Sequence, residues 1–202
     1  MVDHPVPDVR RLHPDRRDRA LTSVVAAFGT DPLLRWVWPD DQRYERCASI
    51  LFGLLLDLRL EGGEVWAVDG GDAVAMWNPP GGLYGPSPEA RWAQVKSQFT
   101  DRENAAWAAV DGAMSVPPEA GPHWYLGVLA TTPARQGCGL GSAVVAPMLA
   151  AADRTGLAAY LETASETNVA FYHRLGFDTD QEVDLPDGGP HCWLLCRPPR
   201  SP

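Results

Sequence analysis

The sequence predicts a single domain, residues 1–202, of the mixed α/β class, with a sheet in which some strands run parallel. The 202 residues are 45% hydrophobic and 21% charged, which suits one packed core rather than a disordered segment. A hairpin pattern lies in the first half of the chain. In the second half, strand and helix patterns alternate, and a strand–helix–strand order places the two strands in parallel.

The first half is divided into elements by prolines and glycines that follow apolar runs. His13-Pro14 ends the first run, Gly29 ends the second, and Gly62-Gly63 ends the third. The EVWAV and AVAMW runs flank Asp69-Gly70-Gly71-Asp72, a turn sequence, so we expect them to pair as a hairpin. The predicted elements are a strand at 9–12, helices at 15–28 and 40–60, strands at 64–68 and 73–77, and helical segments at 91–99 and 104–114.

The second half has the clearer pattern. Gly156 and Gly176 follow two helical runs, and Pro186-Asp187-Gly188-Gly189 separates two strand-like runs at the end. The predicted elements are a strand at 124–131, a helix at 140–154, a strand at 158–162, a helix at 168–175 and two strands between 177 and 196. Cys192 and Cys196 fall four residues apart in the last strand, so we expect them on one face of the sheet.

Composition and charge limit the classes of partner. The net charge of −9 argues against a nucleic-acid partner, because such a protein needs a basic surface. The polar first residues contain no apolar signal segment. The longest apolar run, 50–56, is far shorter than the ~20 residues of a membrane span, so we expect a cytoplasmic protein without a membrane partner. The four cysteines form no CxxC pair and the histidines do not cluster, so we expect free thiols and no metal.

The stretch RQGCGLGS, at 135–142, places three glycines between a strand and a helix. The unpaired N–H groups and the dipole of a helix start attract an anion, and glycine lets a phosphate approach the backbone. A P-loop would need lysine between Gly141 and Ser142, and the dinucleotide pattern GxGxxG would need glycine in place of Ser142. Two interpretations remain open from the glycines alone: a site for another phosphate group, and an ordinary turn before a helix.

Two motifs together resemble the GNAT superfamily of N-acetyltransferases. They are Gln136-x-x-Gly139-x-Gly141 after an apolar strand, and Asn168-x-x-x-Tyr172-x-x-x-Gly176-Phe177 in the following strand–helix unit. Within the superfamily, GLGSAVV at 139–145 and FYHRLGF at 171–177 are similar to the puromycin N-acetyltransferases, and this resemblance is strong over 124–198. The resemblance implies a mixed central sheet with two splayed parallel strands, flanked by helices.

The resemblance also implies acetyl-CoA as the co-substrate. In the family an edge strand pairs with its pantetheine, the glycine loop holds its pyrophosphate, and the helix after the next strand forms the other wall. The residues at these places are Leu129, Ala130 and Thr131 for the pantetheine, Gln136, Gly137, Cys138, Gly139, Leu140, Gly141 and Ser142 for the pyrophosphate, and Ser165, Asn168 and Tyr172 for the other wall. Ser165 stands where many family members have asparagine, and Asn168 also suits a helix N-cap.

The resemblance gives one catalytic role directly and leaves the other open. Tyr172 matches the family's tyrosine near the CoA sulfur, where a phenol can donate a proton to the departing thiolate. Some members place a glutamate midway along the cofactor strand, where this chain has Tyr125. Glu162 is our candidate base; His123 or water are the alternatives, and a structural hydrogen bond is the other interpretation of Glu162. We expect a backbone N–H near Leu129 to hold the thioester oxygen.

Aromatic residues point to the kind of substrate. Those that are not part of the core would line a pocket for a flat or aromatic amine. The set is Trp36, Trp38, Trp77, Tyr84, Trp92, Trp107, Trp124 and Tyr125, of which Trp38, Trp77 and Tyr125 are the predicted substrate contacts.

The resemblance therefore implies an acetyl-CoA-dependent N-acetyltransferase acting on a primary amine of a small molecule. An aminonucleoside antibiotic is the favoured substrate, which would make the protein a resistance enzyme. The same reaction on a protein N-terminus or a polyamine is one alternative. A CoA-binding regulatory module without catalysis is another. The sequence leaves both a monomer and a homodimer open.

Overall fold

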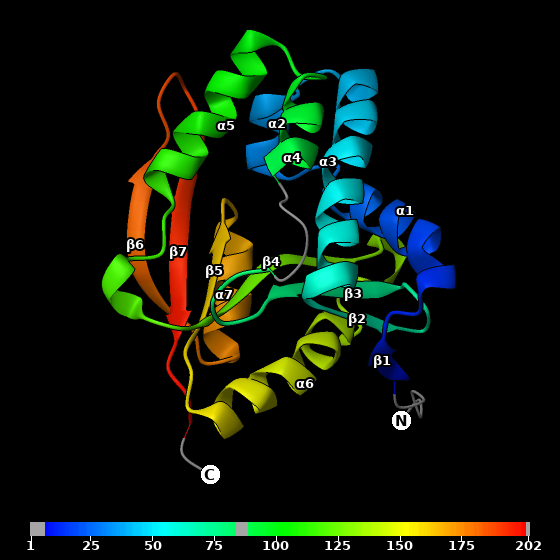
Figure 1. Cartoon of the computed structure of the whole chain (residues 1–202), viewed down its shortest axis with the longest axis vertical. Helices are drawn as coiled ribbons and strands as arrows, with labels where there is room; N and C mark the ends of the chain where they lie inside the picture. Colours follow the sequence, from blue (N-terminus) through cyan, green and yellow to red (C-terminus); the bar gives the residue numbers. More distant parts are fainter. Residues whose placement is uncertain (1–6, 84–88, 201–202) are drawn as a thin grey trace.

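The computed structural model describes residues 7–83 and 89–200, which form a mixed α/β structure around one sheet (Figure 1). The sheet has seven strands in the order β1-β2-β3-β4-β5-β7-β6. They are β1 (Val9–Arg11), β2 (Glu64–Val68), β3 (Ala73–Asn78), β4 (Trp124–Thr131), β5 (Ala159–Thr163), β6 (Asp178–Asp184) and β7 (His191–Arg197). Among these strands, β4 and β5 pair in parallel and the other neighbours are antiparallel. The predicted mixed sheet is confirmed.

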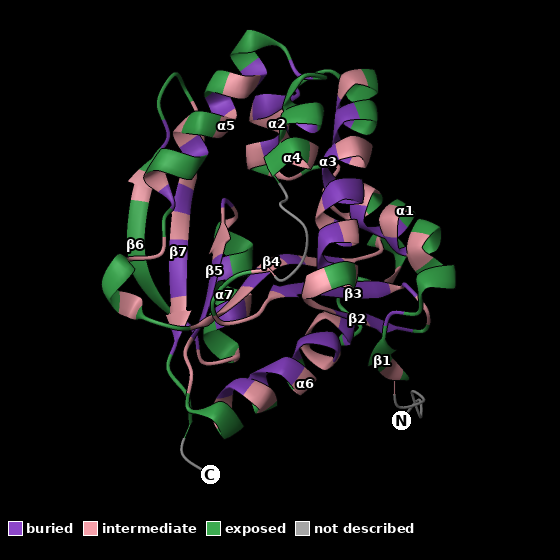
Figure 2. Cartoon of the chain, in the orientation of Figure 1, coloured by how far each residue is buried: buried purple, intermediate pink, exposed green. Residues whose placement is uncertain are grey.

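Helices cover both faces of the sheet. They are α1 (Arg17–Ala27), α2 (Pro32–Val37), α3 (Asp41–Gly62), α4 (Glu89–Lys96), α5 (Asp101–Ala113), α6 (Leu140–Thr155) and α7 (Glu166–Arg174). The side chains of alternate β3 residues point to opposite faces of the sheet. Val74 and Met76 pack with α1 and α3, whereas Ala75 and Trp77 pack with α6 and α7. Figure 2 shows β3 buried along nearly its whole length.

The predicted elements are present with bounds that differ by up to three residues, and the structure adds one short α-helix. The helix α2 was not predicted, because its six residues are too short to show a helical period. Asp31 caps it by accepting a hydrogen bond from the Leu34 N–H at 3.0 Å. The helix α7 begins at Glu166, two residues before the predicted start, so Ser165 is its N-cap and Asn168 lies in its first turn. The N-cap interpretation of Asn168 is therefore wrong.

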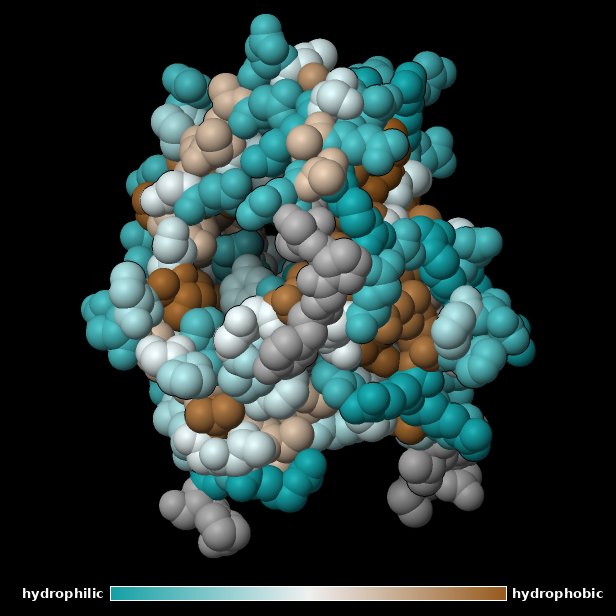
Figure 3. All heavy atoms as spheres, in the orientation of Figure 1, coloured by the Kyte–Doolittle hydropathy of each residue, from teal (hydrophilic) through white to brown (hydrophobic). Residues whose placement is uncertain are grey.

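The strands β4 and β5 separate soon after they begin to pair. Their paired residues are Trp124 with Ala159 and Tyr125 with Tyr160. Beyond that point β4 continues beside β3, and β5 continues beside β7. Residues 126–131 therefore have no partner strand on the β5 side, which confirms the splayed parallel strands. A cavity opens at this side of the sheet, and Figure 3 shows a hollow near the middle of that face.

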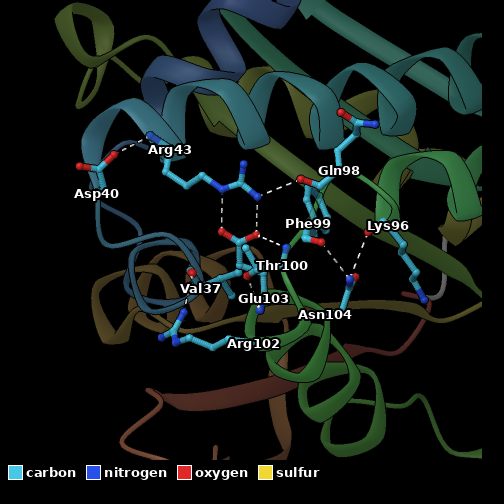
Figure 4. Close-up of polar contacts among 10 residues, drawn as sticks. All are labelled: Val37, Asp40, Arg43, Lys96, Gln98, Phe99, Thr100, Arg102, Glu103 and Asn104. Carbon is cyan, nitrogen blue, oxygen red and sulfur yellow. Dashed lines mark hydrogen bonds and ion pairs between the residues drawn. The ribbon is translucent and has the colours of Figure 1, made fainter.

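The helices α4 and α5, which we call the roof, are held to α2 and α3 by polar contacts (Figure 4). Arg43 of α3 forms a bidentate pair with Glu103 of α5, with Nε–Oε1 at 2.8 Å and Nη2–Oε2 at 2.6 Å. Glu103 is 5% exposed and also accepts a hydrogen bond from the Thr100 N–H at 2.7 Å, within a capping box. Arg102 donates to two carbonyl groups of α2 at 2.9 Å. These contacts fix the roof over the cavity.

Replacing Glu103 with glutamine is expected to lower the free energy of unfolding by about 2 kcal/mol, because the Arg43 cation loses its counter-charge in a partly buried site. Hydrogen bonding from Arg43 holds the pKa of Glu103 below its ordinary value. The contribution is therefore present at neutral pH and is lost as the pH falls through that lowered pKa. Denaturant unfolding at neutral and acidic pH measures both effects.

Glu61→Gln is the control for this prediction. Glu61 is 48% exposed in its ion pair with Arg91, so its substitution is expected to change stability by less than about 0.5 kcal/mol. An equal loss of stability in the two variants would show that burial of the Arg43–Glu103 pair has no special effect.

Candidate active site

A cavity of about 680 Å³ lies where β4 and β5 separate. Its wall is formed on one side by the turn after α1, by α2 and α3 and by the roof, and on the other by the two strands and α7. The wall is mostly apolar, and aromatic rings from the helices and their adjoining turns form much of it. These rings belong to Phe28, Phe52, Trp92, Phe99 and Trp107. An apolar cavity with a few polar groups is typical of a small-molecule site.

The glycine loop between β4 and α6 leaves backbone N–H groups open to an anion. Gly137 and Gly139 have φ angles of 75° and 78°, which favour glycine, and no atom lies within 4 Å of the place of a Cβ at either residue. Gly139 is the N-cap of α6 and supplies no side-chain acceptor to the first-turn amides. The Gln136 side chain donates to the Thr131 carbonyl oxygen at 3.3 Å and ties the loop to β4. The loop thus has the features of a phosphate site.

The side chains of the other residues predicted in this loop differ in their exposure to solvent. Leu140 is 4% exposed and packs into the core on the α6 face of the sheet, so its side chain points away from the loop surface. Cys138 is exposed, and Ser142 is half-buried. A Cβ on Gly141 would stand 3.4 Å from Cζ of Phe171, which is a van der Waals contact distance.

The strand β4 contains a β-bulge in its pairing with β3. Met76 pairs with Val128 and Trp77 pairs with Leu126, so Gly127 is the extra residue. A bulge re-aims the side chains around it. Accordingly, Leu126 packs on the α6 face of the sheet and Val128 packs on the α3 face. The rest of β4 continues as an unpaired edge, which an extended ligand can join.

Glu162 and Tyr125 meet at the point where the strands separate. Tyr125 is the last residue of β4 that pairs with β5, and Glu162 follows its partner, Tyr160, by two residues. The Tyr125 hydroxyl donates a hydrogen bond to the Glu162 carboxylate. Burial raises the pKa of Glu162 to about 7, against the lowering effect of this hydrogen bond. Near neutral pH, Glu162 is therefore poised to accept a proton.

The helix α7 brings Tyr172 and Asn168 to the same cavity. Tyr172 is 7% exposed, and its ring contacts those of Phe171 and Phe177 at centroid distances of 5.2 and 5.8 Å. Burial raises the pKa of the Tyr172 phenol, so its hydroxyl keeps its proton at neutral pH. Asn168 donates a hydrogen bond to Oγ1 of Thr163 at 3.3 Å. The cavity thus holds both a proton acceptor and a proton donor.

Two of the predicted substrate contacts lie elsewhere. Trp38 and Trp77 are fully buried, and neither lines the cavity. Both fill the core, because a large aromatic ring within the sheet or between helices buries more apolar surface there. Ser165 and His123 do not line the cavity either. Tyr84 lies outside the described residues.

Several charged residues of the cavity wall were not predicted. They are Asp31, Arg59, Glu89, Lys96 and Asp111. Arg59 is the most informative, because it is 5% exposed within the leucine-rich helix α3. It follows Leu51 and Leu55 at intervals of four residues, which places a cation on an apolar helical face. That break in the apolar pattern is the signal that could have identified it.

The described part of the chain contains neither a candidate metal centre nor a membrane span. No group of three or more histidine, cysteine, aspartate or glutamate side chains within residues 7–83 and 89–200 is placed to hold a metal ion. No helix in those same ranges has the length and apolar character needed to cross a bilayer. The cysteines are free thiols, and Cys192 and Cys196 face the same cluster on β7, as predicted.

Comparisons with known proteins agree with this geometry. The model of the acetyltransferase (GNAT) family matches residues 30–177. A solved structure from Corynebacterium glutamicum, described as "histone acetyltransferase HPA2 and related acetyltransferase", is 24% identical to this chain. The match covers 97% of this chain and 98% of that chain, with a TM-score of 0.71. Arylalkylamine N-acetyltransferase 2 from Aedes aegypti is 12% identical (96% and 99% covered, TM-score 0.63). A Drosophila melanogaster polyamine N-acetyltransferase that forms N-acetylagmatine is 14% identical (96% and 100% covered, TM-score 0.60). These structures share the fold.

Tyr125→Phe is expected to raise the pKa of Glu162 above about 7, because the variant loses the hydrogen bond that favours the ionised carboxylate. NMR titration of carbon-13-labelled glutamate measures the change. Tyr160→Phe is the control, since Tyr160 stands beside Tyr125 in the sheet but has its hydrogen bond with Cys196. A pKa of Glu162 that is the same in Tyr125→Phe and in the wild type would contradict the proposed contact.

Proposed function

The chain belongs to the acetyltransferase (GNAT) family, and we propose that it acetylates the primary amine of a small molecule with an aromatic body. The observation that carries the proposal is the aromatic-walled cavity that contains Glu162 and Tyr172 beside the open edge of β4. This cavity brings together an apolar compartment for the amine, a proton acceptor, a proton donor and an unpaired strand edge.

Enzymes of this family use acetyl-CoA, which supplies the acetyl group as a thioester. We assign its pantetheine to the backbone of residues 129–131, because this edge of β4 lacks a partner strand. We assign its pyrophosphate to the amides of residues 137–142, where the open glycines and the uncapped start of α6 favour an anion. Asn168 and Tyr172 border the same space from α7.

Glu162 and Tyr172 divide the proton transfers in this proposal. Glu162 removes a proton from the amine, which needs a free lone pair to attack the thioester carbonyl, and a pKa of about 7 suits that role. Tyr172 gives a proton to the sulfur as the carbon–sulfur bond breaks, since its raised pKa keeps the hydroxyl protonated until then. A backbone N–H of β4 near Leu129 stabilises the charge on the carbonyl oxygen. The products are an amide and free CoA.

The wall of the cavity favours an amine with an aromatic body over a polyamine or a protein N-terminus. The rings of Phe52, Trp92 and Trp107 offer apolar surface to a flat body, whereas the long polar body of a polyamine or a protein N-terminus gains little from them. The arylalkylamine enzyme from Aedes aegypti has the same fold. Puromycin, which the resemblance over residues 124–198 favours, has an aromatic amine portion and belongs to this class. Acetylation of puromycin would give the protein a role in antibiotic resistance.

Release of free CoA from acetyl-CoA, followed with a thiol reagent, tests the proposal. The panel of amines contains puromycin, phenethylamine, L-phenylalanine, spermidine and a short peptide. We expect kcat/KM for at least one of the aromatic amines to exceed that for spermidine and the peptide by roughly tenfold or more. Binding of acetyl-CoA without turnover of any amine would refute the proposal and favour a regulatory module.

Tyr172→Phe is expected to lower kcat by about 10²-fold while leaving KM for acetyl-CoA nearly unchanged, because the variant loses the proton donor but keeps the ring. Steady-state kinetics of CoA release measure both quantities. Tyr44→Phe is the matched control: its hydroxyl donates to the Val25 carbonyl oxygen at 2.7 Å, and Tyr44 does not line the cavity. If kcat stays the same in Tyr172→Phe, Tyr172 is not the acid.

Gly139→Val is expected to weaken acetyl-CoA binding by roughly tenfold or more, because a branched side chain at this N-cap crowds the phosphates and disfavours the left-handed backbone. Calorimetry measures the Kd. Gly188→Val is the matched control, since Gly188 has a similar φ of 73° and open surroundings but lies in the turn between β6 and β7. Equal affinities in the two variants would count against the assignment of the loop.

A further inference from the structure

Arg59 is a buried cation in the cavity wall, and the structure gives it no counter-charge. It is 5% exposed, and its Nη1 donates to the Leu55 carbonyl oxygen at 3.1 Å. Its Nε has no hydrogen-bond partner among the described residues, and no carboxylate among them raises its pKa. By contrast Arg197, which is 3% exposed, forms a bidentate pair with Asp153 at 2.7 and 2.8 Å. A buried arginine usually has such a partner.

Gly127 makes room for this guanidinium. A Cβ at position 127 would overlap Nη2 of Arg59 and would stand 3.2 Å from its Cζ. The φ angle of Gly127 lies outside the left-handed region, so the backbone alone does not require glycine there. The same Cβ would stand 3.4 Å from Cε1 of Tyr125. Arg59 therefore lies against the bulge of β4, beside the tyrosine that is hydrogen-bonded to Glu162.

Burial lowers the pKa of Arg59 to about 10, so the side chain is still a cation at neutral pH. A buried charge without a partner is costly, and a bound anion would offset that cost. We propose that Arg59 is the subsite for a carboxylate on the amine substrate, which is then an aromatic amino acid or a related acidic amine. This proposal rests on the acetyltransferase function proposed above. One planar guanidinium matches the two oxygens of a carboxylate in geometry and in charge.

Two of the carboxylates in the cavity wall already accept hydrogen bonds, and the other two, Glu89 and Asp111, do not raise the pKa of Arg59. Asp31 accepts the capping hydrogen bond of α2, and Glu162 accepts one from the β4 tyrosine. The phosphates of CoA are assigned to the glycine loop, which begins beyond the end of β4. From Gly127 to Thr131 alone the strand extends roughly 13 Å, so those phosphates are out of reach of Arg59. A group on the amine substrate is the remaining anion.

The test compares L-phenylalanine with phenethylamine, which lacks only the carboxylate, as acetyl acceptors. For the wild type we expect kcat/KM for phenylalanine to exceed that for phenethylamine by at least roughly tenfold. Arg59→Met should abolish this preference and leave phenethylamine nearly unaffected. The proposal is overturned if the wild type prefers phenethylamine. It is also overturned if Arg59→Met loses activity equally on both amines, because Arg59 would then act on the thioester or on the fold.

A binding measurement keeps this test independent of turnover. Calorimetry compares 3-phenylpropionate with 3-phenylpropanol, which have no amine and differ in the carboxylate. Selective binding of 3-phenylpropionate that Arg59→Met abolishes supports the subsite even if no amine is acetylated. Equal binding of the two compounds refutes the subsite even if amines are acetylated. The failure of the subsite and the failure of the acetyltransferase proposal thus give different results.

Two further variants separate the position of the guanidinium from its charge. Gly127→Ala keeps Arg59 but forces its guanidinium to move, so we expect the preference for 3-phenylpropionate to fall as in Arg59→Met. Arg17→Met is the control, because Arg17 is already paired with Asp57 at 2.6 Å and does not line the cavity. It should keep the preference of the wild type. If Gly127→Ala binds 3-phenylpropionate as selectively as the wild type does, the proposed subsite is contradicted.

Discussion

Two parallel strands that pair at only two positions leave the backbone groups along the rest of their facing edges without sheet partners. In this protein, β4 and β5 separate in this way, and the site lies along the separation. Tyr125 and Glu162 meet at its narrow end. The unpaired edge of β4 leads from there to the glycine loop and the start of α6. The fold thus leaves open amide groups that a complete sheet would have used internally, and the proposed function assigns them to the acyl donor.

The two sides of the cavity are stabilised in different ways. The side formed by the sheet and α7 depends on apolar packing, in which Leu140 and Tyr172 are nearly fully buried. The roof depends in addition on the paired charges of Arg43 and Glu103. Arg59 belongs to neither class, because it is buried like a structural residue but has no internal partner. This contrast with paired arginines is why a ligand is the natural source of its counter-charge.

The elements of the fold and the glycine loop could be predicted because their signals are local. The turn glycines, the helical periods and the residues of the two motifs lie within short stretches of the chain. The contacts of Arg59 with Gly127 and of Tyr125 with Glu162 could not be predicted in this way, because each joins segments that meet only after the helices pack and the strands take their register. Trp38 shows the same limit: the sequence indicates an aromatic ring but not whether it fills the core or lines a cavity.

The roof contributes no strand to the sheet and no residue to the glycine loop, although it forms part of the cavity wall. It lies between β3 and β4 as an insertion whose fixed points are on α2 and α3. Under the proposed function, substitutions on its inner surface change the wall that contacts the amine and leave unchanged the groups assigned to the acyl donor. Recognition of the amine and use of the donor can diverge at separate rates in evolution, so descendants of one such scaffold can acquire new acceptors without rebuilding the chemistry.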